Sequence, residues 1–374
     1  MTLGSNSESP GKVSRLVVKL GTGVLAPTPG KIETTRLRTL AESILALREE
    51  GLEVILVSSG AVGLGMGRLG LEERPADLAT LRACAAVGQS LLMNVWREVL
   101  EPIGLVTAQI LLTREDFRSR KSSMNVGDTL KRLLEQGSVP IVNENDSVSD
   151  EEIRFGDNDV LSALLASLWK AEMLAILSTA PGLMTNIEGG EIIPFVAEIT
   201  PSIEAMAEGT RSSTAVGGMI TKIEAAKIAT KSGCAVFVGK GENYFELSSI
   251  LAGDADGTFF APAGIGLNER KKWLAFFPEP TGTLVIDDGA SQAIMHGGKS
   301  LLAKGLVSFR GEMSRADVVA IENPLGETIA RGICRFNTQE LDQVKGKNNA
   351  EILKLFPGRT RAEVVHRDHL APLS

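Results

Sequence analysis

Cysteine, histidine and long apolar runs are all scarce in this sequence. Its 374 residues include only three cysteines and three histidines. Cys84, Cys234 and Cys334 lie far apart, and there is no CxxC motif or Cys/His pair, which argues against a disulfide framework and against a zinc site. We therefore expect buried free thiols, as is usual in a reducing cytoplasm.

The apolar segments are expected to be too short to cross a membrane. The stretch Val160–Trp169 ends at Lys170, well short of the ~20 apolar residues that a span requires. Residues 1–14 are polar, lack the apolar run of a signal peptide and are expected to form a disordered tail. We expect a cytoplasmic protein with no membrane partner. The net charge of −7 also argues against a general binder of polyanions.

The amino-acid composition and the length are typical of a globular chain with two domains. Hydrophobic residues make up 43% and charged residues 23%, which is neither a disordered nor a fibrous composition. A chain of 374 residues also exceeds the size of one ordinary core. Because the composition changes near Pro278–Gly282, we predict a first domain over residues 15–277 and a second, with a C-terminal extension, over residues 278–374.

The first domain alternates short β-branched runs with amphipathic helical stretches. The expected strands are Arg15–Leu20, Val54–Ser58, Thr107–Leu112, Val139–Asn143, Met173–Ser178 and Ala235–Val238. Helical spacing is present around Leu37–Leu47 and in Asp77–Leu100, Ser123–Glu135, Val160–Lys170 and Thr221–Lys231. Strands separated by helices predict an α/β fold with a parallel sheet covered on both faces. Ligands of such sheets bind beyond the carboxyl ends of the strands.

The second domain is predicted to be β-rich. Its short runs are separated by Gly, Asn-Pro and Asp-Gly signals, which indicates a small barrel or sandwich. The expected strands there are Thr283–Ile286, Leu306–Phe309, Val318–Ile321 and Thr328–Cys334.

The end of the first strand carries the first candidate for phosphate binding. Lys19 is followed by Gly21, Thr22 and Gly23, and glycines at this place let backbone N–H groups approach a phosphate. A plain turn from strand to helix would explain the glycines equally well. Lys19 favours the phosphate, because a lysine in an apolar strand end is costly unless it meets an anion. Ser58–Ala61, after the second strand, is another turn of small residues with room for a ligand.

Amides and carboxylates gather after the fourth strand and at the start of the following helix. The segments are Asn143–Asp146 and Gly156–Asp159. One of these side chains is expected to cap the helix, but capping does not require so many. Acceptors of this kind suit the amino group of an amino acid, a lysine ammonium or hydrated magnesium.

A third candidate opens the helix that begins near Thr221. The run Val216–Lys222 is not a Walker loop, whose order is GxxxxGK[ST]. Glycines at a helix N-terminus still form an anion site, because free N–H groups and the helix dipole point at the ligand. Lys222 would be unfavourable at the positive end of that dipole unless a phosphate is bound.

In this order and spacing, these elements resemble the glutamate 5-kinases of the amino-acid kinase family. The most specific segments are VVKLGTGVL, VSSGAVGLG, AAVGQSLL, LLTREDF, VNENDSV, FGDNDVLSALLA and GGMITK. From Gly282 to about Phe336 the chain is similar to a PUA domain, in GTLVIDDGA, GKSLLAKGL and IARGICRF. Acetylglutamate kinases, aspartokinases and uridylate kinases lack that second domain.

The resemblance implies the amino-acid kinase fold, a mainly parallel sheet between helix layers, joined to a small β-barrel PUA-like domain. It implies phosphorylation of the glutamate γ-carboxylate by ATP with Mg²⁺, the first step of proline biosynthesis. By resemblance, Lys19 and Lys222 flank the transferred phosphoryl group and Asp159 orients both lysines.

Further site residues follow from the same resemblance. Glutamate would be held by Ser59, Gly60, Asp146, Asp157 and Asn158. The residues implied for ATP are Lys19, Gly21, Thr22, Ser178, Thr179, Val216, Gly217, Gly218, Met219, Ile220, Thr221 and Lys222. No metal ligand is assigned. A glutamate carboxylate with a pKa of about 4.3 is already ionised at neutral pH, so the reaction needs no general base. It therefore needs none of the three histidines, all of which lie in the second domain.

The nucleotide side departs from the family pattern. Ser178–Leu183 reads STAPGL where Thr-Asp and a longer loop are usual, Val216 and Ile220 stand where Thr and Ser are usual, and Gly23 replaces a common Ser. These changes put nucleotide affinity and base preference in question.

Two alternatives to an active kinase follow. One is a catalytically weak regulatory protein that senses glutamate. The other is an RNA-binding protein acting through the PUA-like domain, although residues 281–374 carry twelve Lys/Arg against eleven Asp/Glu and so lack a basic excess. For partners, the resemblance implies a homodimer or homotetramer and functional coupling to glutamyl-phosphate reductase.

Overall fold

The computed structural model describes residues 13–25, 32, 34–148, 157–186, 190–208, 218–241, 247–263 and 280–373. The chain divides into two compact units, which part between Ile265 and Gly266, with Phe117–Arg120 grouped with the second unit. The boundary predicted at residues 277–278 and the predicted tail up to residue 12 lie outside the described residues.

The first unit is built on an eight-stranded sheet with the order β3-β4-β2-β1-β5-β7-β8-β6. The strands are β1 (Arg15–Leu20), β2 (Glu53–Ser58), β3 (Thr107–Leu112), β4 (Val139–Glu144), β5 (Met173–Ser178), β6 (Phe195–Val196), β7 (Ala235–Lys240) and β8 (Gly257–Phe260). All neighbours pair in parallel except β7 and β8. The six predicted strands are present within two residues of their expected ends. The short strands β6 and β8 were not predicted.

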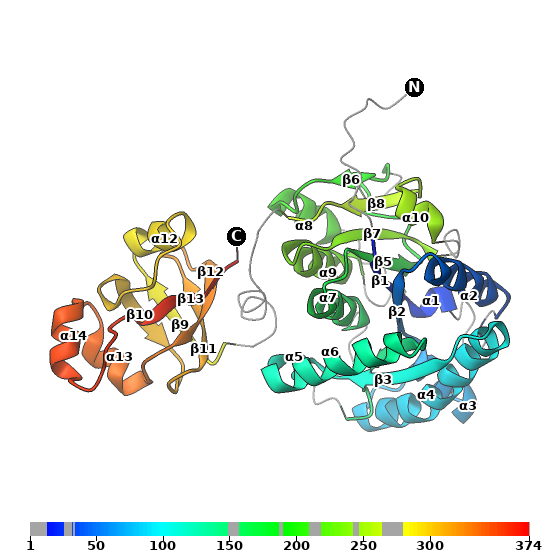
Figure 1. Cartoon of the computed structure of the whole chain (residues 1–374), viewed down its shortest axis with the longest axis horizontal. Helices are drawn as coiled ribbons and strands as arrows, with labels where there is room; N and C mark the ends of the chain where they lie inside the picture. Colours follow the sequence, from blue (N-terminus) through cyan, green and yellow to red (C-terminus); the bar gives the residue numbers. More distant parts are fainter. Residues whose placement is uncertain are drawn as a thin grey trace. The chain divides into compact units, whose positions relative to one another are not determined.

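Helices cover both faces of this sheet (Figure 1), as predicted. They are α1 (Thr22–Leu25), α2 (Thr34–Glu49), α3 (Ala61–Leu69), α4 (Leu78–Leu100), α5 (Arg114–Arg118), α6 (Arg120–Glu135), α7 (Asp157–Trp169), α8 (Pro201–Glu208), α9 (Met219–Lys231) and α10 (Ser248–Ala252), with a short 3₁₀ turn η1 (Glu101–Ile103). Around the central strands, α7, α8 and α9 lie on one face and α1, α2 and α10 on the other.

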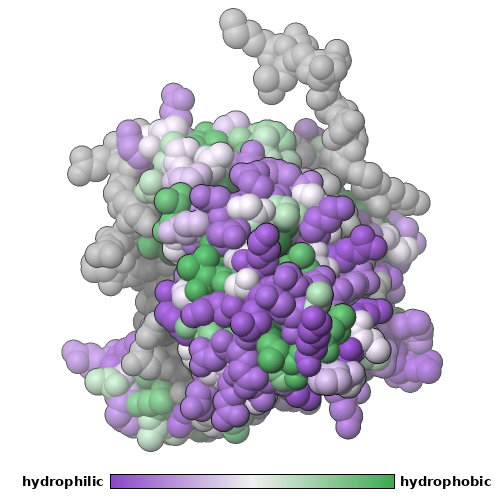
Figure 2. Space-filling model, turned by 90° about the vertical axis from the view of Figure 1, so that its left-hand side faces the viewer, coloured by the Kyte–Doolittle hydropathy of each residue, from purple (hydrophilic) through white to green (hydrophobic). Residues whose placement is uncertain are grey.

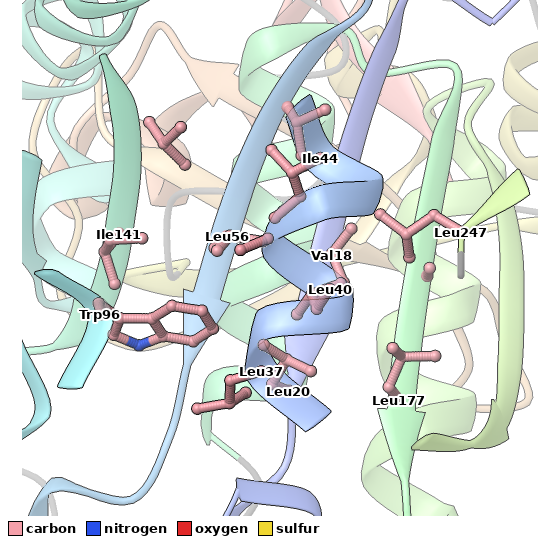
Figure 3. Close-up of a cluster of buried hydrophobic side chains, with 14 of the residues drawn as sticks. Val18, Leu20, Leu37, Leu40, Ile44, Leu56, Trp96, Ile141, Leu177 and Leu247 are labelled. Carbon is pink, nitrogen blue, oxygen red and sulfur yellow. The ribbon is translucent and has the colours of Figure 1, made fainter. Parts of the chain in front are cut away.

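The core between α2 and the sheet holds β1 in place. Leu37, Leu40 and Ile44 recur at helical spacing and are fully buried against Val18 and Leu20 of β1 (Figure 3). Each such side chain contributes about 1.5–3 kcal/mol on burial. The end of β1, with Lys19, is therefore anchored by a dry apolar layer.

Two glycines let α3 and α4 touch at their backbones. A Cβ at Gly65 would lie 1.8 Å from the carbonyl oxygen of Cys84, and one at Gly88 would lie 1.7 Å from that of Ala61. Glycine is otherwise unfavourable inside a helix. The close approach explains why the glycine-rich stretch Ala61–Leu69 is helical, where the sequence indicated only a small-residue turn.

One helical segment of the described chain, Leu78–Ile103, is long and apolar enough to cross a membrane by length and composition. The expectation that the apolar segments are too short to cross a membrane was based on Val160–Trp169 and did not take this segment into account. Core helices pass the same test, and Leu92, Trp96 and Leu100 of α4 are fully buried in the core of the first unit.

The second unit contains the predicted β-rich domain. Its five-stranded sheet has the order β10-β9-β11-β12-β13. The elements are β9 (Gly282–Ile286), α12 (Asp288–Met295), η3 (Ala303–Gly305), β10 (Leu306–Arg310), β11 (Val318–Glu322), β12 (Thr328–Cys334), α13 (Thr338–Val344), α14 (Asn349–Leu355) and β13 (Val365–Pro372). Four strands match the prediction, and β13 was missed.

The second unit has its own apolar core, which includes Leu284, Ile321 and Phe336. The side of the molecule shown in Figure 2 is mainly hydrophilic, with small separate hydrophobic areas. Cys334 is a buried free thiol, as are Cys84 and Cys234 in the first unit.

Candidate active site

The candidate site lies where the chain changes direction across the sheet. Strand β1 has β2 on one side and β5 on the other, so the connections leave it in opposite directions. Such a switch point leaves a crevice at the carboxyl ends of the strands. Lys19 lies at this end of β1, Ser59 directly follows β2, and Ser178 ends β5.

A buried carboxylate between two lysines forms the centre of the site. Lys19 Nζ lies 2.5 Å from Asp159 Oδ1, and Lys222 Nζ lies 3.2 Å from Asp159 Oδ2. Asp159 is completely buried, and the two lysine side chains are each only 6% exposed. Residues from β1, α7 and α9 are thereby brought together, as the sequence predicted for these three side chains.

In this cluster two ammonium groups share the carboxylate of Asp159, and all three side chains are shielded from water. Burial alone would raise the pKa of Asp159, but the attraction of Lys19 and Lys222 holds it below its usual range. Burial lowers the pKa of Lys222, an effect that Asp159 opposes and Lys19 adds to. Two buried ammonium groups so close together are costly, and an anion bound beside them lowers that cost.

The start of α9 contributes a hydroxyl and an open helix end. Thr221 Oγ1 donates to Asp159 Oδ2 over 2.8 Å. Gly218 is the N-cap and offers no side chain to the first N–H groups of the helix. Met219 is buried, whereas the Ile220 side chain is largely exposed. Val216 and Gly217, also predicted to bind ATP, lie outside the described residues.

The loops after β1 and β5 lie against each other. Gly21 N–H donates to the Leu177 carbonyl over 3.0 Å, and a Cβ at Gly21 would lie 3.7 Å from Lys19 Nζ. A Cβ at Gly23 would lie 2.7 Å from Thr179 Cγ2. The Thr179 methyl group therefore fills the space that a larger residue at position 23 would need. These contacts bring Gly21, Ser178 and Thr179, from the predicted ATP-binding set, to one edge of the sheet, and Thr22 follows Gly21 as the first residue of α1.

Beside the charged cluster lies a group of neutral amides. Asn158 Nδ2 donates to Ser59 Oγ and to Asn143 Oδ1, each over 2.9 Å. Asn158 Oδ1 accepts the backbone N–H of Glu144 over 3.3 Å. Gly60, which follows Ser59, has φ of 107° and turns the chain from β2 into α3, a conformation that favours glycine. The side chain of Asp157 lies outside the described residues.

A pocket of 320 Å³ opens next to these amides. Its lining includes Asp146 and Glu144 after and within β4, Gln109 from β3, and Gln89 and Ala85 from α4. The Asp146 carboxylate lies close enough to Arg74 to raise the pKa of that guanidinium, against a larger lowering by burial.

Sequence reasoning missed Gln89, Gln109 and Arg74 as site residues. Gln89 was signalled by its motif AAVGQSLL, which was quoted for the resemblance without a role. Gln109 and Arg74 carried no comparable signal, because the pairing of β3 with β4 and the course of the α3–α4 loop decide their positions.

Neither a metal cluster nor a histidine belongs to this site in the described residues. No group of three or more His, Cys, Asp or Glu side chains there could hold a metal ion. The histidines, His296, His366 and His369, lie in the second unit.

Comparisons with known proteins show which proteins this chain is similar to. The model of the amino acid kinase family matches residues 14–240, and that of the PUA domain matches residues 282–356. Glutamate 5-kinase from Moorella thermoacetica is 42% identical over 96% of each chain. Glutamate 5-kinase from Syntrophotalea carbinolica is 42% identical over 96% of this chain and 97% of its own. A solved structure of carbamate kinase from Giardia lamblia, bound to AMP-PNP, covers 67% of this chain and 99% of its own at 15% identity, with a TM-score of 0.48.

Proposed function

The chain belongs to the amino acid kinase family and, within it, to the glutamate 5-kinases; from this premise we propose that it transfers the γ-phosphoryl group of ATP to the γ-carboxylate of L-glutamate. The product is γ-glutamyl 5-phosphate, the first intermediate of proline biosynthesis.

One observation carries the proposal. Lys19 and Lys222 are both buried at the switch point and share the single carboxylate of Asp159. Two ammonium groups held together at the carboxyl ends of the strands are suited to the triphosphate of ATP. Asp159 then holds the two ammonium groups at fixed positions before the substrates arrive.

The reaction needs charge neutralisation more than proton transfer. The γ-carboxylate is ionised at neutral pH and attacks the γ-phosphorus directly. A carboxylate oxygen–phosphorus bond forms while the bond between that phosphorus and the bridging oxygen of ADP breaks. Both reactants are anionic, so the lysines act by attracting the phosphoryl oxygens as charge shifts toward ADP. Positioning of the two reactants supplies the rest.

The acceptor side provides both a carboxylate and neutral hydrogen-bonding groups. The Asp146 carboxylate, which lines the 320 Å³ pocket, would pair with the α-ammonium group of glutamate. Asn158 orients Ser59 by donating to its hydroxyl oxygen over 2.9 Å. We assign the backbone of Gly60 and the carboxylate of Asp157 to the same acceptor site.

The nucleotide would occupy the edge formed by Gly21, Thr22, Ser178, Thr179 and the start of α9. We propose that Mg²⁺ enters as a complex with ATP, because Mg²⁺ at such sites is held largely by substrate phosphates. The described residues offer no carboxylate cluster of their own for it. Val216 and Gly217 complete the proposed phosphate-binding turn.

Neither alternative function is favoured by an observation. A glutamate sensor without kinase activity would not require two buried lysines at the phosphate position. An RNA-binding role would require a basic surface, which the near-balanced charge of residues 281–374 does not indicate.

The proposed reaction and the family resemblance also indicate partners and a location for this enzyme. An acyl phosphate is reactive, so a reductase that consumes glutamyl phosphate should act directly after this enzyme. We also propose a cytoplasmic location and a homodimer or homotetramer, in line with the family resemblance.

The proposed activity is tested by trapping the product. Purified protein with L-glutamate, ATP and Mg²⁺ should form an acyl phosphate that hydroxylamine converts to the hydroxamate, while ADP is released in equal amount. Omission of Mg²⁺ should abolish the signal, and aspartate or N-acetylglutamate should replace glutamate poorly. ADP release without hydroxamate, or equal use of all three acceptors, would contradict the proposal.

A further inference from the structure

A chain of side-chain amides runs from Asn158, beside Ser59, to Gln89 and Gln109 in the lining of the acceptor pocket. Asn158 Nδ2 donates to Asn143 Oδ1 over 2.9 Å, and Asn143 Nδ2 donates to Gln89 Oε1 over 2.9 Å. Gln89 Nε2 in turn donates to Gln109 Oε1 over 3.1 Å. Four side chains from α7, β4, α4 and β3 therefore form one continuous hydrogen-bonded row.

The direction of this row is determined by the backbone. The N–H of Glu144 donates to Asn143 Oδ1 over 2.9 Å, and a backbone N–H cannot accept. The Asn143 oxygen must therefore face Glu144, and its amide nitrogen must face Gln89. Gln89 then presents oxygen to Asn143 and nitrogen to Gln109. Reversal of any one amide would place two donors or two acceptors opposite each other.

Both ends of the row present a donor. Ser59 Oγ accepts from Asn158, so the Ser59 hydroxyl hydrogen is directed elsewhere. At the other end Gln109 uses its oxygen for Gln89, which leaves the NH₂ group of Gln109 as a donor beside the pocket that this residue lines. Within the described chain, that NH₂ group donates to no protein acceptor.

Two donors at opposite ends match an acceptor with a carboxylate at each end. Ser59 follows β2, and its backbone N–H bonds to the carbonyl of Leu20, the residue after Lys19, so this end lies on the phosphoryl side. Gln109 lies at the other end of the row, on the edge strand β3, and Asp146 lines the same pocket. Ala61 and Ala85, which line the same pocket as Gln109, are small side chains that leave space for methylene groups.

We propose that Gln109 is a specificity-determining residue that donates to the α-carboxylate of the acceptor, and that Gln89 is the positioning residue that orients it. This inference rests on the proposed function and extends it to the selection of an α-amino dicarboxylic acid. The enzyme then rejects 4-aminobutanoate, which has the amino group and the reacting carboxylate. That molecule lacks the α-carboxylate that would accept the hydrogen bond from Gln109.

The test compares Gln109→Glu with the unchanged protein. The substitution keeps the shape, removes the donor and places a negative charge opposite the α-carboxylate. We expect the KM for L-glutamate to rise about 10- to 100-fold, as for loss of a hydrogen bond to a charged group. The kcat should change less than about threefold and the KM for ATP should stay constant. Gln136→Glu makes the same charge change at an exposed position after α6 and should alter none of these values.

Substrate analogues separate this role from a general disturbance of the pocket. Inhibition constants against glutamate are measured for glutarate, which has both carboxylates but no amino group, and for 4-aminobutanoate, which lacks the α-carboxylate. Gln109→Glu should weaken glutarate as strongly as glutamate and leave 4-aminobutanoate within about twofold. Gln89→Glu, which can accept from Asn143 but cannot donate to Gln109, should show the same pattern with a smaller rise in KM.

The outcomes distinguish the two proposals. An equal loss for all three ligands, or no loss for glutamate, would overturn the role of Gln109 while leaving the kinase activity intact. If the unchanged protein forms no acyl phosphate from glutamate, the proposed function fails, and this inference fails with it. Melting temperatures of all variants are compared to exclude unfolding.

Discussion

Each unit of this protein buries a carboxylate between two cationic side chains, but the two clusters differ in how much water reaches the cations. In the first unit Asp159 lies between Lys19 and Lys222, whose side chains are each 6% exposed. In the second, Glu340 lies between Arg315 and Arg359, whose side chains are 61% and 19% exposed. In each cluster one carboxylate pairs with two cations.

The cluster in the second unit is complete without a ligand. Glu340 accepts from Arg315 Nε and from the Asn337 backbone N–H, each over 3.0 Å. Arg359 Nη2 donates to both oxygens of the Glu340 carboxylate, over 3.2 and 3.0 Å. Asn337 and Glu340 form a capping box at the start of α13. Arg359 also lies over the ring of Phe336, 4.1 Å from its centre. Water solvates the remaining charge on Arg315, so this cluster serves the fold.

The comparison indicates that burial of the cations, and not the ion pairs themselves, marks the site of chemistry. In the first unit both cations are enclosed and favour a bound anion. In the second, water screens the charge of Arg315. The predictions below test this distinction, beginning with the largest expected effect.

Removal of one lysine should damage catalysis far more than folding. Lys19→Ala or Lys222→Ala leaves Asp159 paired with the other lysine, so the buried carboxylate keeps a partner. Loss of one cation at the transferred phosphoryl group should raise the barrier by about 3–4 kcal/mol, a fall of ~10²–10³ in kcat. Steady-state kinetics and thermal unfolding check both halves of this prediction, and near-normal turnover in either variant would refute the assignment.

Loss of the half-buried carboxylate Asp146 should affect binding more than turnover. In Asp146→Ala the α-ammonium group of glutamate loses a charge-assisted hydrogen bond worth about 1.5–3 kcal/mol. The KM for glutamate should therefore rise about 10- to 100-fold, with a much smaller change in kcat. A fall in kcat as large as that for the lysine variants would place Asp146 at the phosphoryl group instead.

Neutralisation of the second cluster should cost stability and no activity. The hydrogen bond from Arg315, followed by the N–H of Asn337 and the charge of Arg359, lowers the pKa of Glu340 from 4.5 to about 2, although burial opposes this. We expect Glu340→Gln to destabilise the second unit by about 1–3 kcal/mol at pH 7, with allowance for the exposure of Arg315.

The pH dependence of that loss has a defined sign. The folded pKa of Glu340 is below the unfolded value, so its stabilisation is present above pH 4.5 and is lost as the pH falls toward about 2. Scanning calorimetry of both proteins between pH 7 and pH 3.5 should show the difference in melting temperature shrinking over the acid part of this range. A constant difference would mean that the ionised form of Glu340 is not what stabilises the fold.

Removal of the residues after Pro280, which include the sheet of the second unit, should have the smallest effect on the reaction. Every residue assigned a role precedes Lys231, so a chain ending after Pro280 should fold and keep kcat within about threefold of the full chain, since domains with separate cores fold independently. Activity and melting temperature of the two proteins are compared. A folded but inactive truncated protein would show that the second unit completes the site.

The sequence predicted those elements whose local residue pattern matches their place in the fold. The apolar runs of β1 and β5 and the helical spacing of Leu37, Leu40 and Ile44 predicted the sheet and its cover. The family resemblance implied that Lys19, Asp159 and Lys222 meet, and their places at strand and helix ends near the switch point of the sheet explain why they do. Confirmation of these positions comes from the structure, while their roles stay predictions.

The elements that were missed depend on tertiary contacts. Helix α3 contains several glycines, and only its backbone contact with α4 accounts for Gly65. Strand β13 includes His366 and Asp368 and lacks an apolar alternation, because it is an edge strand of the second sheet. Gln109 can be recognised as a candidate site residue only from its hydrogen bond with Gln89, which no local sequence pattern predicts.

The most direct test of the distinction between the two clusters exchanges one cation in each for a neutral side chain of similar length. In Lys222→Met, kcat for glutamyl phosphate formation should fall by ~10²–10³ while the melting temperature stays constant or rises, because the cost of burying one charge is removed and Asp159 keeps Lys19 as its partner. In Arg359→Met, kcat should be unchanged while the second unit melts at a lower temperature. The account would be contradicted if Lys222→Met kept its turnover, or if Arg359→Met lost turnover as severely as Lys222→Met.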